Sequence, residues 1–297
     1  MRVLISGCGY VGSALGLLLA AEGHTIFGLR RNTKALPTAI RPIRADLSKT
    51  LPPDTLPPDL DVVVHAASPG GSTDEAYRLA YAQGPRNLLA ALEPQQNLRR
   101  LVFVSSTGVY AQKNGEWVNE ESSTEPETTS SKRLLEGESL ALGCPFPTTV
   151  LRLGGIYGPG RTGAIERALG GAPEEDPPRY TNRIHRDDCA GALRHLILLP
   201  DPAPVYLGVD NEPATRHTIA EWLASRLGAR PGARLDETAA PTRSTLRGGP
   251  RDASRSRTNK RCSNARLIHS GYHFHYPTFR EGFAALLPET PTRGPGW

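Results

Sequence analysis

The chain has 297 residues, enough for one large or two small domains. Its hydrophobic fraction of 38% excludes a wholly disordered chain. A membrane-spanning chain is excluded because no apolar run approaches the roughly 18 residues that span a bilayer. The net charge is +5, but basic residues concentrate between Arg243 and Arg266, where Asp252 is the single acid. This uneven distribution argues against a general nucleic-acid-binding protein.

The cysteines and histidines indicate a reduced, metal-free protein. Cys8, Cys144, Cys189 and Cys262 are scattered without a CxxC pair, so we expect free thiols. The histidines at 269, 273 and 275 have no nearby cysteine or carboxylate cluster to complete a metal site, so we expect none. The N-terminus lacks a signal-peptide pattern, and we expect a cytoplasmic monomer or homodimer that acts on a small molecule.

Short apolar runs alternate with helical segments in the first half of the chain. The strand Arg2–Ser6 leads through a glycine-rich turn into a helix at Ser13–Glu22. Further strands are predicted at 24–29, 41–46, 61–67, 101–105 and 148–153. Helices are predicted at Thr73–Leu92, with a kink or restart at Gly84-Pro85, and at Ser130–Leu142. This alternation predicts an α/β fold, a doubly wound parallel sheet of the Rossmann type.

The pattern loosens after Gly160 into Pro-rich stretches around a helix at Asp187–Leu199. We therefore expect a nucleotide-binding domain at 1–160, with residues 183–209 returning to it. A smaller C-terminal α/β substrate domain should occupy 161–297 and contain a basic loop near 243–261. The composition of Thr238–Asn259 predicts that this loop is mobile.

Gly7, Gly9 and Gly12 form G-x-G-x-x-G between the first strand and the first helix. The first glycine permits the tight turn, the second lets the backbone approach a pyrophosphate, and the third lets the helix pack close to the strand. The phosphates would lie at the helix N-terminus, where free N–H groups and the helix dipole favour anions. The motif therefore predicts a dinucleotide-binding site.

Arg30 and Arg31 follow the second strand, where an acid would select NAD and an arginine accommodates the 2′-phosphate of NADP. The next acid in the chain is Asp46, and Asp46-Leu47 lies where such folds hold the adenine. We therefore predict NADP(H). The alternative is a solvated arginine pair in an arginine-rich chain, with NAD as the cofactor.

Five segments together resemble the extended or atypical short-chain dehydrogenase/reductases of the NAD-dependent epimerase/dehydratase group. They are GCGYVG (7–12), HAA (65–67), SSTGVY (105–110), LRLGGIYGPGR (151–161) and RIHRDD (183–188). The resemblance covers nearly the whole chain. It implies a Rossmann fold and an enzyme that acts on a carbonyl or hydroxyl group.

The resemblance also implies roles for individual residues. Ser106 corresponds to the hydroxyl that binds a substrate carbonyl, with Thr107 as a second hydroxyl and Tyr110 facing the pocket. It implies cofactor contacts by Gly7, Gly9, Tyr10, Val11, Gly12, Ala66, Ala67, Ser105, Lys132 and Ile156. Substrate contacts are implied for Arg152, Tyr157, Arg161, Arg186, Lys260 and Arg261, and Arg186 and Asp187 lie where the family joins its two domains.

The family's proton-transfer residue is missing. In a Y-x-x-x-K helix the lysine lowers the pKa of the tyrosine, which then exchanges a proton near neutral pH. Here Lys132 is in place, but Thr128 occupies the tyrosine position. Two hypotheses follow. In the first, the protein is an atypical reductase, epimerase or dehydratase whose proton is handled by Tyr110, by Ser106 with a water, or by the substrate. In the second, it is a non-catalytic NADP-binding sensor or scaffold. For the enzyme, a nucleotide sugar is the substrate class suggested by analogy.

Overall fold

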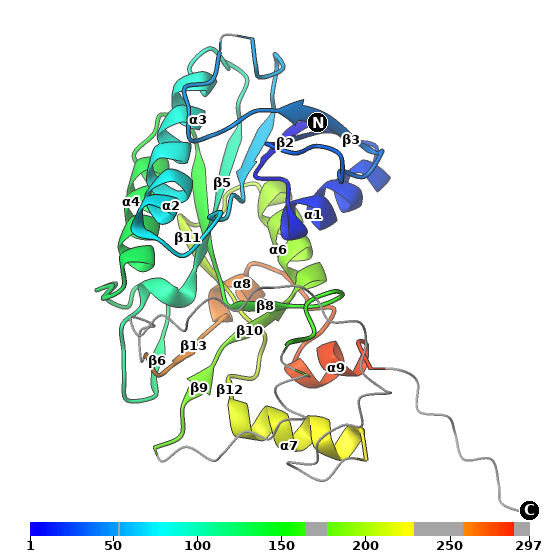
Figure 1. The fold of residues 1–297 in the computed structure, drawn as a ribbon, viewed down its shortest axis with the longest axis vertical. Helices are drawn as coiled ribbons and strands as arrows, with labels where there is room; N and C mark the ends of the chain where they lie inside the picture. Colours follow the sequence, from blue (N-terminus) through cyan, green and yellow to red (C-terminus); the bar gives the residue numbers. More distant parts are fainter. Residues whose placement is uncertain (53, 164, 166–176, 229–257, 288–297) are drawn as a thin grey trace, which may run out of the picture.

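A seven-stranded parallel sheet forms the centre of the molecule (Figure 1). The computed structural model describes residues 1–52, 54–163, 165, 177–228 and 258–287. The strand order is β11-β7-β5-β4-β1-β2-β3, and all neighbours run parallel. Their bounds are Arg2–Ser6 (β1), Thr25–Arg30 (β2), Ile40–Arg44 (β3), Val62–His65 (β4), Arg100–Ser106 (β5), Thr148–Leu153 (β7) and Val205–Gly208 (β11). The predicted doubly wound sheet is confirmed.

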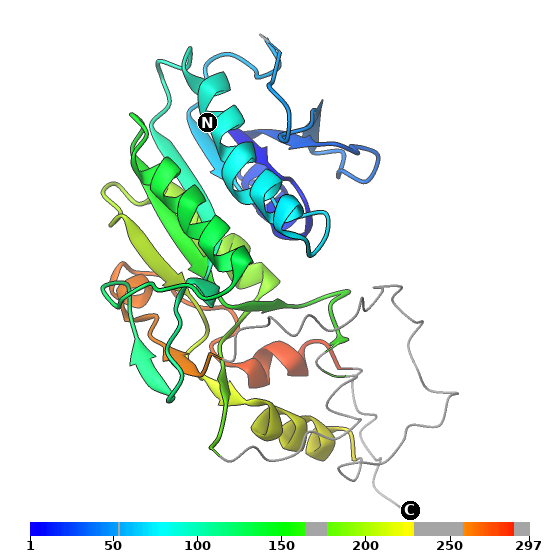
Figure 2. The same cartoon turned by 60° about the vertical axis from the view of Figure 1, so that its left-hand side comes forward.

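Helices cover both faces of this sheet (Figures 1 and 2). One face packs on α1 (Tyr10–Ala21) and α6 (Arg186–Leu198), and the other on α3 (Gly84–Leu92) and α4 (Thr129–Leu142). Successive strand residues point to opposite faces, so each strand supplies apolar side chains to both cores. Continuous apolar strand sequences are typical of such doubly covered sheets. Among the described residues, no helix has the length and apolar character needed to cross a membrane.

The helical run between β4 and β5 changes its hydrogen-bond pattern where the sequence predicts an interruption. Helix α2 (Asp74–Arg78) passes into a π-helical turn, η1 (Leu79–Gln83), and α3 begins at Gly84. The amide of Gly84 donates to the carbonyl of Leu79, five residues earlier. Pro85 has no amide hydrogen, so it cannot donate to the Tyr81 carbonyl four residues before it. The Gly84-Pro85 pair therefore coincides with the change of pattern.

The second part of the molecule lies at the carboxyl ends of the large sheet and consists of short strand pairs and helices (Figure 2). The strand pairs are β8 (Gly155–Tyr157) with β10 (Arg183–His185), β9 (Tyr180–Thr181) with β12 (Ala214–Thr215), and β6 (Glu116–Val118) with β13 (Lys260–Cys262). The helices include α7 (Arg216–Arg226), α8 (Ala265–His269) and α9 (Phe279–Ala284). The domain boundary at 160 stays a prediction. The predicted mobile loop lies outside the described residues, apart from Thr258 and Asn259.

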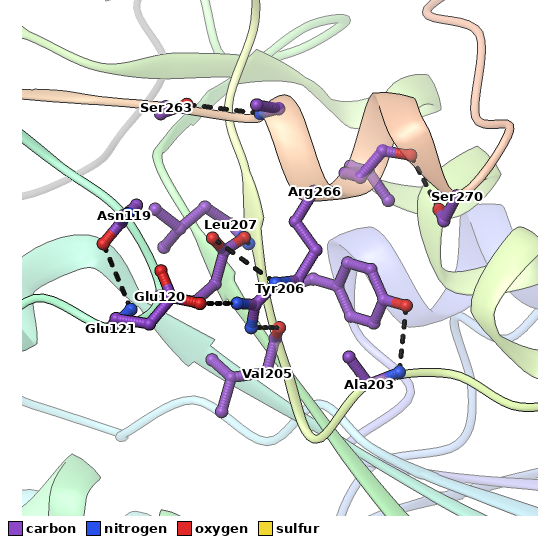
Figure 3. Close-up of polar contacts among 12 residues, drawn as sticks. Asn119, Glu120, Glu121, Ala203, Val205, Tyr206, Leu207, Ser263, Arg266 and Ser270 are labelled. Carbon is purple, nitrogen blue, oxygen red and sulfur yellow. Dashed lines mark hydrogen bonds and ion pairs between the residues drawn. The ribbon is translucent and has the colours of Figure 1, made fainter.

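Side chains close the outer edge of β11 (Figure 3). Glu120 accepts a hydrogen bond from the amide of Leu207 at 3.0 Å, and Arg266 on α8 donates to the carbonyl of Val205 at 3.1 Å. Arg266 also pairs with Glu121. Because an open strand edge offers unpaired backbone groups to other chains, these contacts protect the edge and fix α8 against the sheet.

Candidate functional site

The glycine loop has the close backbone contacts that its sequence predicts. Gly7 has φ +83°, and a Cβ there would collide with the backbone of Ala67 at the end of β4. A Cβ on Gly12 would lie 2.8 Å from a side-chain carbon of Ile5, so this glycine lets α1 pack on β1. Gly9 caps α1 without a side-chain hydrogen bond, and the first turn holds no acid. The amide groups at the start of α1 are therefore available to an anion.

A cavity of about 370 Å³ lies beside this loop, at the carboxyl ends of β1 to β4. It is lined by Gly7, Gly9, Leu29, Arg30, Arg31, Asn32, Ala45, Asp46, Leu47, Ser48, Ala67, Ser68, Gly70, Ala76, Leu79 and Ala80. The structure thus brings together the glycine loop, the arginine pair after β2, and Asp46-Leu47. Half of the predicted cofactor residues are not part of this lining: Tyr10, Val11, Gly12, Ala66, Ser105, Lys132 and Ile156.

Two guanidinium groups and one carboxylate set the charge of the cavity. Arg30 donates to the carbonyl of Cys8 at 3.2 Å, and Arg31 is exposed. A hydrogen bond from the Ser48 hydroxyl, at 2.8 Å, lowers the pKa of Asp46, and the positive charge of Arg31 acts in the same direction. Asp46 is therefore an anion at neutral pH, and the arginines leave this end of the cavity positive.

Tyr10 connects the glycine loop to the segment after β8. Its hydroxyl donates to the carbonyl of Pro159 at 2.8 Å. The guanidinium carbons of Arg161 and Arg186 lie 4.1 and 5.4 Å from the centre of its ring, and Arg186 also pairs with Asp187 at 2.8 Å. Two of the predicted substrate arginines therefore meet at the start of α1.

The loop 105–110 at the end of β5, called the hydroxyl loop below, is held in place by α4. Ser106 accepts a hydrogen bond from the amide of Gly108 at 3.1 Å, which leaves its own proton available to a ligand. Ser131 donates to the carbonyl of Gly108 at 2.8 Å, and Thr128 donates to Ser131 at 2.8 Å. Thr128 is also the N-cap of α4. Thr128 therefore serves as a helix cap at the position of the family tyrosine.

The expectation that Tyr110 faces the pocket is wrong. Its side chain is fully buried among Val109, Val118 and Cys262, and burial raises its pKa to about 12. Its hydroxyl accepts a hydrogen bond from Arg152 at 2.7 Å. Apolar neighbours and an internal donor thus take up the whole side chain.

The expected substrate contact of Arg152 is contradicted as well. Arg152 and Glu138 are 7% and 3% exposed and form an ion pair at 2.7 Å inside the protein. Burial by itself would lower the pKa of Arg152, but the hydrogen bond to Glu138, the negative charge of Glu138 and the contact with Tyr110 together outweigh it, and the pKa is raised. A guanidinium that is paired and enclosed in this way has no face left for a ligand.

Lys260 is also held internally, on β13, which corrects its assignment to substrate, whereas its neighbour Arg261 is half-buried and its assignment stays a prediction. The ammonium group of Lys260 is buried and donates to the carbonyl of Tyr110 at 2.9 Å, and burial lowers its pKa. Arg261 donates to the carbonyl of Gly115 at 2.7 Å, and its guanidinium carbon lies about 5 Å from the ring centres of Trp117 and Tyr180. These residues hold the chain after the hydroxyl loop.

The remaining predicted residues divide by exposure. Lys132 is exposed on α4, whereas Thr107 is buried. Tyr157 is buried against Phe283, with ring centres 4.5 Å apart, so it joins β8 to α9. Ser105 is buried, and its hydroxyl has no hydrogen-bond partner among the described residues.

Sequence reasoning missed Asp188, which ties the C-terminal segment to α6. This fully buried carboxylate accepts hydrogen bonds from the Tyr272 hydroxyl at 2.8 Å and from the amides of His275 and Tyr276 at 2.7 and 2.9 Å. Its neighbours Arg186 and Asp187 were expected at this junction. Asp188 is the second acid of RIHRDD, so the motif contained a signal for it. Its hydrogen-bond partners could not be identified from the sequence, because they lie more than 80 residues further along the chain.

The comparisons with known proteins agree with this architecture. The model of the NAD dependent epimerase/dehydratase family matches residues 3–193, and no curated protein matches. A putative NAD-dependent epimerase/dehydratase from Methylobacillus flagellatus is 36% identical, covers 96% of this chain and 97% of its own, and has a TM-score of 0.76.

Two more distant structures share the fold. MoeE5, in complex with UDP-glucuronic acid and NAD, is 21% identical over 96% of this chain and 97% of its own, with a TM-score of 0.76. The human epimerase family protein SDR39U1, with NADPH, is 20% identical over 96% and 98%, with a TM-score of 0.73. The matched family model, together with the 36% identical relative, shows that this chain belongs to the NAD-dependent epimerase/dehydratase family.

Proposed function

We propose that the chain is an NADP(H)-dependent oxidoreductase or epimerase/dehydratase that acts on a carbonyl or hydroxyl substrate. The observation that carries this proposal is the single cavity that joins the glycine loop to Arg30 and Arg31. No acid follows β2 to bind a ribose 2′-hydroxyl, and the exposed guanidinium of Arg31 suits a 2′-phosphate. The related human protein was solved with NADPH.

The residues present fit a dinucleotide. A side chain on Gly7 would fill the space against Ala67, and the uncapped N-terminus of α1 offers N–H donors for phosphate groups. The hydroxyl of Ser105, which has no hydrogen-bond partner in the described part of the chain, is a further donor near the end of β5. When bound, the nicotinamide group would exchange a hydride with the substrate.

Ser106 is the residue that we assign to the substrate carbonyl. Its oxygen is fixed by the amide of Gly108, and its proton remains available. A hydroxyl held in this way donates to a carbonyl oxygen and stabilises the negative charge that develops there. Thr128 does not supply the proton because its hydroxyl is engaged with Ser131 as part of the α4 cap.

A nucleotide sugar is the substrate class that we propose. Arg161 and Arg186 beside Tyr10 would meet its anionic part. MoeE5, which shares the fold, was solved with UDP-glucuronic acid.

A specific observation favours the second candidate, a non-catalytic NADP-binding sensor. Two hydroxyls associated with the missing tyrosine have structural roles: Tyr110 is buried with its pKa raised to about 12, and Thr128, at the tyrosine position, is a helix cap. Turnover separates the two candidates.

Titration of the protein with NADPH and NADH, followed by nicotinamide fluorescence, tests the cofactor. We expect NADPH to bind more tightly, and Arg31→Ala to weaken NADPH by about tenfold without changing NADH, because one charge-assisted contact to the 2′-phosphate is lost. Arg41→Ala, an exposed arginine on β3, is the control. Failure of the wild type to bind either cofactor would contradict the proposal.

A panel of UDP-sugars, incubated with the protein and NADP(H), then tests catalysis by product analysis. Turnover that is lost in Ser106→Ala supports the enzyme. Tight NADPH binding without turnover of any panel member supports the sensor.

A further inference from the structure

The π-helical turn η1 lies between the cofactor cavity and α4. Leu79 and Ala80 in η1, with Ala76 in α2, form the wall of the cavity on the helix side. On the opposite side of η1, a Cβ added to Gly137 of α4 would collide with the carbonyl oxygen of Tyr81. This carbonyl is the one that Pro85 leaves without an α-helical donor. The absence of a side chain at Gly137 therefore lets α4 pack directly against η1 at the Tyr81 carbonyl.

The same turn contacts the segment that follows β3. A Cβ added to Gly84 would lie 3.0 Å from the carbonyl oxygen of Leu79 and 3.5 Å from the Cβ of Leu47. Asn87, one helical turn later, donates to the carbonyl of Leu47 at 2.8 Å. Leu47 also lines the cavity. The end of η1 thus packs against the Asp46-Leu47 segment, and a Cβ on residue 84 would press on the Leu79 carbonyl while making an ordinary contact with Leu47.

A neutral histidine lies beneath the turn. His65 is buried, stacks on Phe103 with ring centres 5.4 Å apart, and has its Nδ1 3.3 Å from the hydroxyl of Ser6. Burial lowers its pKa to about 4, while the backbone of Ala80 acts in the opposite direction. Its uncharged ring therefore packs between Phe103 and the Ala80 backbone of η1.

We propose that η1 is a positioning element for the adenosine end of the cofactor: Gly84 and Pro85 impose a wide turn that holds the Leu79-Ala80 wall against Leu47. A π-helical turn contains about one residue more than an α-helical turn. Leu79 and Ala80 are therefore rotated relative to α3 from the positions that they would have in a continuous α-helix. π-Helical turns occur frequently at functional sites. The proposal rests on the dinucleotide binding proposed above, but not on the choice between NADP and NAD.

The experiment uses Gly84→Ala and Pro85→Ala in the full chain. Gly84→Ala crowds the Leu79 carbonyl, and Pro85→Ala supplies the missing donor to Tyr81, so that a continuous α-helix can form. Each should weaken binding of ADP, NADH and NADPH by the same factor, about tenfold, because the adenosine end is common to all three and small displacements of a site are costly. ADP binding is measured by calorimetry and nicotinamide binding by fluorescence.

Two control variants match these changes away from the cavity. Gly143→Ala places a Cβ 3.1 Å from a helical carbonyl, that of Ser139 at the end of α4, and Pro94→Ala removes an exposed proline after α3. Both should bind all three ligands like the wild type. Circular dichroism and thermal unfolding identify any variant that does not fold. If one of Gly84→Ala and Pro85→Ala does not fold, the other one decides the result.

The outcomes separate this inference from the proposed function. Folded Gly84→Ala or Pro85→Ala protein that binds ADP as tightly as the wild type would overturn the role of η1 and leave the cofactor assignment intact. A wild type that binds ADP but neither NADPH nor NADH would overturn the proposed function, while loss of ADP binding in the variants would still support the inference. A wild type that binds none of the three overturns both.

Discussion

The cavity beside the glycine loop and the region around Tyr110 use their polar side chains in opposite ways. At the cavity, Arg31 is exposed and the N-terminus of α1 has no cap. Around Tyr110, Arg152 is paired with Glu138, and Lys260 donates to a backbone carbonyl. A polar group that serves a ligand has to retain unsatisfied bonding capacity, whereas a group with internal partners stabilises the fold.

The largest effect should come from breaking the buried ion pair. Glu138→Ala leaves the guanidinium of Arg152 buried without its carboxylate, and we expect a loss of about 3–5 kcal/mol in the free energy of unfolding. Urea unfolding measures this. The exposed pair Arg78–Glu75 provides the control, because Glu75→Ala should lower the free energy of unfolding far less than Glu138→Ala does. Equal effects of the two substitutions would show that Arg152 is not held as we describe.

Next in size is the effect of a side chain in the glycine loop. Gly7→Ala forces a Cβ against Ala67, and the displaced loop should weaken NADPH binding by about a hundredfold, or about 2.7 kcal/mol. Gly23→Ala is a matched control, since Gly23 has almost the same φ, +84°, but no atom within 4 Å of an added Cβ. NADPH fluorescence titration distinguishes them. Undiminished binding by Gly7→Ala would contradict the close approach that we assign to this loop.

A buried carboxyl group outside both regions should make stability depend on pH. Burial raises the pKa of Asp210 to about 8, so the folded protein keeps a proton that the unfolded chain releases near its ordinary pKa of 3.8. Between about pH 4 and pH 8 this group should therefore lower the stability as the pH rises, by up to about 1.4 kcal/mol per pH unit.

Thermal unfolding of Asp210→Asn against pH measures this contribution. The variant should lose the dependence in this window and gain stability relative to the wild type as the pH rises. The exposed Asp201→Asn should follow the wild-type profile. Identical profiles for wild type and Asp210→Asn would show that Asp210 is ionised in the folded protein.

The smallest effect concerns the position of the family tyrosine. Thr128→Ala removes the cap of α4 and should cost about 1 kcal/mol of unfolding free energy, whereas Thr128→Ser should restore most of it. NADPH affinity should stay unchanged in both. A large loss of turnover in Thr128→Ser, which keeps the cap, would instead give Thr128 a role in the chemistry.

The amino-acid sequence alone predicted every strand of the large sheet except β11, together with the glycine loop and the restart of the helix at Gly84-Pro85. These features depend on local properties: runs of apolar residues, glycines at fixed spacing, and a proline without an amide hydrogen. The positions of Arg30, Arg31, Asp46 and Leu47 also follow directly from strand ends, because parallel strands end at one edge of a sheet. Seven of the sixteen lining residues were therefore predicted, whereas the helical wall at Ala76, Leu79 and Ala80 was not.

Which charged and hydroxyl-bearing side chains remain available to a ligand depends on how distant segments pack together. Arg152 and Glu138 are 14 residues apart, Lys260 and Tyr110 150 residues apart, and Asp188 binds backbone amides 87 and 88 residues away. No local pattern specifies such partners, because they arise from packing of distant segments. The same residue type is therefore exposed at the cavity in Arg31 and enclosed in the core in Arg152, and burial and an internal partner make the difference.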